Sequence, residues 1–233
     1  MGINWRLIFL ALGLPPSAAA ASDAHDGPSA YHFSRLETDV GLSHGDAVSR
    51  WDLDAWYGGD FNKIWVKSEG EYLRGKAEQA RFWGMYSRNV AMYWDVQAGL
   101  RQDLAPGGTS FLTFGVLGLA PYYFETEAHV FLSNRGDVSA RLREENDLLI
   151  TQRLIAQPYV EANFYTRDDP RQEVGAGVAG EVGIQTRYEF TRKFAPYIDI
   201  RYEDNFGGSG RAAERAGENR SSFVASIGIR LMY

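Results

Sequence analysis

From Phe33 onward, apolar and polar residues alternate with a period of two in one segment after another. The segment SSFVASIGIRLMY, for example, places Phe223 and Ile227 on one face and Ser226 and Arg230 on the other. Such alternation is typical of β-strands with one apolar face. We predict twelve strands of this kind, near 33–44, 50–57, 62–72, 78–88, 93–103, 109–120, 122–132, 138–150, 153–167, 178–192, 196–206 and 221–233.

Two architectures use strands of this kind. In a β-sandwich the apolar faces of two sheets meet, whereas in an outer-membrane barrel they meet lipid and the polar faces line a lumen. The predicted segments run to about ten residues, close to the 9–11 that cross a bilayer. Aromatic residues gather near their ends, as expected at the two membrane interfaces, among them Tyr57, Phe61, Tyr93, Trp94, Tyr122, Tyr123, Tyr165, Tyr197 and Tyr233.

The connections between the segments favour the barrel. An even number of strands puts both ends of the barrel segment on the same side, which we take as the periplasm. The connections then expected on that side are short, near 58–62, 88–91, 120–122, 151–153 and 193–195. The two longest, near 167–177 and 207–220, fall outside, as in such barrels. We therefore predict an all-β fold: a transmembrane antiparallel up-and-down β-barrel of about 12 strands over 33–233. Only 210–218 favours a helix.

The N-terminal segment reads as an export signal. MGINWR is positively charged, LIFLALGL is an apolar run of eight residues, and PPSAAAAS supplies small residues for a signal peptidase. We expect a cleaved signal peptide at 1–21, with processing near Ala20, Ala21 or Ser22. A short flexible periplasmic arm at 22–32 then precedes the barrel.

Composition limits the partners. The net charge of −6 and a pI near 5.3 argue against nucleic acid, because no basic surface is implied. The chain has no cysteine, so thiolate metal sites are excluded. No stretch approaches 18 consecutive apolar residues, which excludes a bundle of transmembrane helices.

Several irregular segments resemble the copper-resistance protein B family of Gram-negative outer membranes. They occur in the order AWYGGDFNKIWVKSEGE, YWDVQAGLRQDLAPG, GVLGLAPYYFETEA, LITQRLIAQPYVEANFYTRDDP, YEFTRKFAPYI and FGG, and the resemblance runs from about Leu53 to Tyr233. It implies an outer-membrane barrel that handles copper ions alongside periplasmic copper proteins. Many members of the family carry an arm rich in methionine and histidine, whereas residues 22–32 hold only His25 and His32 and no methionine.

Candidate copper ligands lie on one predicted strand. Glu125, Glu127 and His129 share its polar face. Residues two apart on a strand lie about 6.6 Å from each other. Imidazole and carboxylate suit copper(II), whereas thioether sulfur suits copper(I), which Met85 and Met232 would supply from their inward positions. The alternative for the acidic residues is a lumen charge network with arginines such as Arg141 or Arg143, and for the methionines a filling role.

A second candidate copper site lies in the arm. Cleavage after Ser22 would leave Asp23-Ala24-His25 at the new N-terminus, where an amine, two amides and the His25 imidazole form a square-planar copper(II) site. Cleavage after Ala21 would move His25 to the fourth position and weaken such a site.

Two other motifs give weaker signals of function. GAGVAG at 175–180 has the spacing of a dinucleotide-binding loop, but alternation resumes after it, so we expect a glycine-rich hairpin end. His32 and Ser34 in YHFSR have the spacing of some outer-membrane hydrolases, without a G-x-S-x-G motif nearby. We expect no enzymatic activity.

The resemblance thus implies that the barrel binds or passes copper and contributes to copper resistance. The residues alone predict a lumen rich in carboxylates that favours cations. The alternative function is a general small-solute channel or scaffold without copper selectivity.

Overall fold

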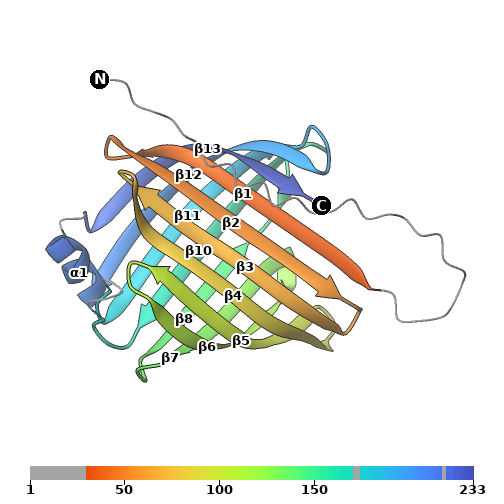
Figure 1. Ribbon diagram of the computed structural model, residues 1–233. Helices are drawn as coiled ribbons and strands as arrows, with labels where there is room; N and C mark the ends of the chain where they lie inside the picture. Colours follow the sequence, from red (N-terminus) through yellow and green to blue (C-terminus); the bar gives the residue numbers. More distant parts are fainter. Residues whose placement is uncertain (1–29, 170–173, 217–218) are drawn as a thin grey trace, which may run out of the picture.

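The computed structural model describes residues 30–169, 174–216 and 219–233. It contains one antiparallel sheet that closes on itself, because the last strand pairs with the first (Figure 1). The strands in chain order are β1 (Tyr31–Ser43), β2 (Asp46–Gly58), β3 (Asn62–Leu73), β4 (Lys76–Ala91), β5 (Trp94–Ala105), β6 (Thr109–Ala120), β7 (Phe124–Ser133), β8 (Val138–Glu145), β9 (Leu148–Leu149), β10 (Leu154–Tyr165), β11 (Gly177–Tyr188), β12 (Phe194–Gly207) and β13 (Ser221–Met232).

Twelve of these strands form the wall, each pairing with its two neighbours in chain order. The two-residue β9 continues β8 along the same partner, β10, after an irregular step at 146–147. The predicted fold class and strand number are therefore confirmed.

The wall carries exposed apolar side chains on its outer face and buried, mostly polar side chains on its inner face. On β13, Phe223 and Ile227 are 58% and 63% exposed, whereas Val224 and Ser226 between them are 2% and 3% exposed. The same alternation places Leu, Ile, Val and Phe side chains on the outside of the other strands. A barrel with an apolar exterior and a polar interior is a transmembrane barrel.

The two ends of the barrel differ in their connections. The terminal end, where β1 begins and β13 ends, carries the connections at 59–61, 92–93, 121–123, 146–153 and 189–193. The opposite end, called the loop end below, carries the two longest, at 166–176 and 208–220. The parity of loop lengths predicted from the sequence is thus observed. Gly175 and Ala176 lie in one of these loops and the glycines after them enter β11, so GAGVAG is a hairpin end.

Two short helices complete the described chain. The 3-10 helix η1 (Pro121–Tyr123) turns the chain at the terminal end, and α1 (Gly208–Ala216) lies at the loop end, where a helix is predicted (Figure 1). No helix within the described ranges is long and apolar enough to cross a membrane.

Strand β1 starts at Tyr31, two residues before the predicted boundary between arm and barrel. The predicted signal peptide and His25 lie outside the described residues.

Candidate functional site

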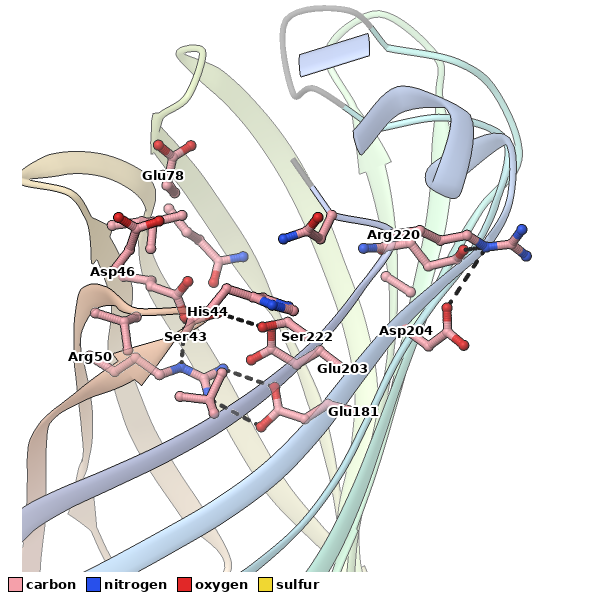
Figure 2. A pocket seen from close by; sticks show the side chains of 18 of the residues that line it. Ser43, His44, Asp46, Arg50, Glu78, Glu181, Glu203, Asp204, Arg220 and Ser222 are labelled. Carbon is pink, nitrogen blue, oxygen red and sulfur yellow. Dashed lines mark hydrogen bonds and ion pairs between the residues drawn. The ribbon is translucent and has the colours of Figure 1, made fainter. Parts of the chain in front are cut away.

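The loop end of the lumen holds a cavity of about 320 Å³ (Figure 2). Carboxylates outnumber arginines in its lining by seven to three. Arg50 Nη2 lies 3.0 Å from Glu181 Oε2, and Arg50 Nε lies 3.1 Å from Glu71 Oε2. The other five carboxylate residues outnumber the other two arginines, so the lining of this cavity is acidic on balance. The acidic residues of its lining are Asp46, Glu71, Glu78, Glu161, Glu181, Glu203 and Asp204.

The terminal end of the lumen holds a larger cavity, of about 520 Å³. Its lining combines eight acidic with six basic residues, and aromatic side chains such as Phe33 and Trp56 add an apolar part. The acidic residues are Asp52, Asp54, Glu69, Glu125, Glu127, Glu145, Asp147 and Glu189.

A smaller cavity of about 100 Å³, called the middle cavity below, shares lining residues with both of these cavities. It shares Arg50, Glu161 and Glu181 with the loop-end cavity. It shares Glu69 and Arg141 with the terminal-end cavity. The three cavities therefore form one series along the barrel.

One side of the lumen is filled instead by apolar side chains from β3 to β7. We call this cluster the aromatic wedge; it consists of Trp65, Trp83, Met85, Phe111 and Phe131. The Trp83 and Phe131 rings meet edge to face with centroids 5.1 Å apart. Arg101 packs its guanidinium 4.3 Å from the Phe131 ring centre while it binds Asp103 through two 2.7 Å hydrogen bonds. The cavities thus lie mainly against β8 to β13 and β1 to β3, and the terminal-end cavity also borders β6 and β7.

Two of the predicted copper ligands meet at the edge of the wedge. His129 Nδ1 lies 3.3 Å from Glu127 Oε1, and the imidazole is almost fully buried. Its Nε2 lies 2.9 Å from Gln97 Oε1, and its ring packs edge-on against Trp83. The amine of Lys67 on β3 donates to Glu127 Oε2.

The alternative charge network is also present, with different partners from those predicted. Glu127 pairs with Lys67, whereas Arg141 pairs with Glu69 and Glu161, and Arg143 pairs with Glu145 and Asp52. The inward positions of these residues follow from the alternation in the sequence. Glu145 lies on the same strand as Arg143, and Glu161 lies on the strand paired with that of Arg141. The other three pairs join strands far apart in the chain, so no local sequence signal identifies them.

Among the described residues, the remaining predicted ligands do not form a metal-binding group with this pair. Glu125 lines the terminal-end cavity two residues before Glu127, and Met232 lines the same cavity. Met85 is buried in the aromatic wedge, which agrees with the filling role. Within the described ranges, no three His, Cys, Asp or Glu side chains are grouped so that they could hold one metal ion.

The predicted hydrolase pair lies at the terminal end of β1. The His32 ring stacks on Tyr233 with centroids 5.6 Å apart, and Ser34 exchanges two backbone hydrogen bonds of 2.8 Å with Tyr233. These contacts close the seam between β1 and β13.

Comparison with known proteins relates the chain to copper resistance. The family model described as Copper resistance protein B precursor (CopB) matches residues 29–233. Copper resistance protein B of Escherichia coli is 40% identical over 185 residues, which cover 78% of this chain and 62% of that protein. The Copper resistance protein B homolog of Pseudomonas syringae pv. tomato is 37% identical over 185 residues, covering 78% and 63%. The chain therefore spans less than two thirds of the length of these relatives.

Two solved structures with a similar fold are porins. The NanC porin aligns with a TM-score of 0.59 and 16% identity, over 84% of this chain and 98% of that chain. The KdgM porin aligns with a TM-score of 0.54 and 8% identity over the same shares. The barrel fold and the family together support an outer-membrane location. The chain belongs to the copper resistance protein B family.

Proposed function

We propose that this barrel binds copper ions in its lumen or passes them through it, and thereby contributes to copper resistance. The observation that carries the proposal is the excess of carboxylates over basic groups in both end cavities of a chain from this family. A cavity lined mainly by one sign of charge raises the local concentration of ions of the opposite sign. Copper ions would therefore gather at both ends of the lumen.

Glu127 and His129 are the side chains that best suit copper(II) inside the barrel. Their closest atoms are 3.3 Å apart, and imidazole and carboxylate are both ligands of this ion. Binding would require His129 to exchange Gln97, or Glu127 to exchange Lys67, for the ion. The cost of these exchanges favours weak, reversible binding, which suits an ion in transit.

Calorimetric titration of the purified barrel with Cu(I) and with Cu(II) tests the proposal. We expect binding that weakens when Glu127→Ala and His129→Ala are combined. A matched control combines His32→Ala with Asp60→Ala, which removes the same kinds of group away from the lumen cavities. Affinity no higher than that of an unrelated barrel, unchanged by the lumen variant, would refute copper binding at this pair.

The alternative function is a general small-solute channel or scaffold without copper selectivity. The arm poor in histidine and methionine favours it. Under this alternative, the barrel would bind copper no better than other divalent cations in the same titration.

We further propose that residues 1–21 are removed as a signal peptide and that the barrel catalyses no reaction. The mass of the mature N-terminus tests the first point and decides whether His25 occupies the third position. An esterase assay of refolded protein, with Ser34→Ala as the control, tests the second.

A further inference from the structure

The middle of the lumen is crossed by ion pairs that join opposite walls. Arg143 Nη1 on β8 lies 3.5 Å from Asp52 Oδ2 on β2. These two strands are six places apart in the ring of twelve, so they face each other across the lumen. Arg35 on β1 lies 3.5 Å from Glu145 on β8. Such pairs occupy the cross-section of the barrel rather than its wall.

Arg141 on β8 is the centre of this arrangement. Its Nη1 lies 2.8 Å from both carboxylate oxygens of Glu69 on β3, and its Nη2 lies 2.8 Å from Glu161 Oε2 on β10. The side chain is 6% exposed, and Trp83 of the aromatic wedge lies beside the guanidinium, with the ring centre 5.6 Å away. Arg141 is therefore held from three directions.

The contacts of Arg141 with Glu69 and Glu161 lie between the two large cavities of the lumen. Glu161 lines the loop-end and middle cavities, whereas Arg141 and Glu69 line the middle and terminal-end cavities. An ion that moves between the two large cavities must pass the contacts of Arg141. There it meets a fixed positive charge, and the carboxylates nearest to it are already paired.

We propose that Arg141 closes the lumen in this state and limits its permeability to cations. The inference rests on the proposed passage of a cation through the barrel, and it names the residue that regulates that passage. Displacing the guanidinium leaves Glu69 with Arg81 and Glu161 with Asn163. Each carboxylate then has an oxygen released from Arg141. The same movement therefore opens the lumen and supplies cation ligands. Lys67 and Glu127 lie farther toward the terminal end and are not part of this closure.

Conductance of the purified full-length protein in planar bilayers tests this inference with potassium chloride alone. For Arg141→Gln we expect a severalfold higher single-channel conductance and a reversal potential shifted toward cation selectivity. Arg141→Lys keeps the charge and loses the two-sided bridge, so we expect higher conductance with the selectivity of the wild type. Arg192→Gln, which removes a charge from an exposed turn at the terminal end, is the matched control and should behave as the wild type.

Glu69→Gln serves as the second variant in case Arg141→Gln does not fold, which circular dichroism would reveal. It weakens the same bridge but leaves Arg141 charged, so we expect higher conductance with less cation selectivity than Arg141→Gln. Wild-type conductance and reversal potential in whichever of these variants fold would overturn the proposal. Because no copper is used, this result is independent of the copper titration, which alone decides whether the barrel binds copper.

Discussion

The two sides of the lumen are built from different chemistry. The aromatic wedge between β3 and β7 is a packed apolar core turned into the barrel, with Trp83 and Phe131 almost fully buried. The side from β8 through β13 to β3 is held by ion pairs such as Arg141–Glu69 and Arg50–Glu181. Dissolved ions do not weaken apolar packing, whereas they screen ion pairs and can replace one partner of a pair. We therefore expect the wedge to supply most of the stability and the charged side to bind or pass cations.

The largest expected loss of stability comes from removing the centre of the wedge. Trp83→Ala should lower the free energy of unfolding by about 3–5 kcal/mol, because it leaves a cavity in a packed cluster. Urea titration in lipid vesicles measures this. Phe82→Ala is the matched control, because that ring faces outward and its removal opens no cavity inside the lumen. Equal losses in both variants would show that the wedge is not a core.

A smaller loss is expected where the wedge meets His129. A Cβ at Gly115 would lie 2.2 Å from His129 Cδ2 and 2.5 Å from the Ala128 carbonyl oxygen. Gly115→Ala should therefore cost about 1–3 kcal/mol through overpacking. Gly84→Ala places the same methyl group where no atom lies within 4 Å, so its unfolding should match the wild type. If the two alanine variants unfold alike, His129 is not packed against β6 as described.

The smallest expected loss comes from an ion pair where the charged side meets the wedge. Lys67→Met keeps the length of the side chain and removes the cation beside Glu127 and Asp54. We expect a loss of about 1 kcal/mol, because Glu127 retains His129 and Asp54 retains Arg35 and Trp65. Raising the salt concentration should reduce this difference but not that of Trp83→Ala, because only the charged contact is screened. A salt-independent loss at Lys67 would remove the distinction between the two sides.

The sequence predicts the barrel well because its signals are local. Period-two alternation identifies which side chains of β13 face lipid and which face the lumen, and the turns set the order of the strands. The inward positions of Glu127 and His129 follow in the same way. Their neighbours do not, since Lys67 and Gln97 reach them through the closure and tilt of the whole barrel. The aromatic wedge is missed for a related reason: Trp83 and Phe131 lie on different strands, and only closure brings them together.

Two adjacent residues of β11 test whether the apolar face of each strand meets lipid while the polar face lines the lumen. The chain has no cysteine, so single cysteines can be placed at Glu181 and Val182 on β11 without background. Glu181 lines two lumen cavities, and Val182 is 54% exposed on the outside. In outer-membrane vesicles, a water-soluble maleimide should label Glu181→Cys and spare Val182→Cys, which a lipid-soluble reagent should label. Rapid labelling of Val182→Cys by the water-soluble reagent would show that the apolar face does not meet lipid.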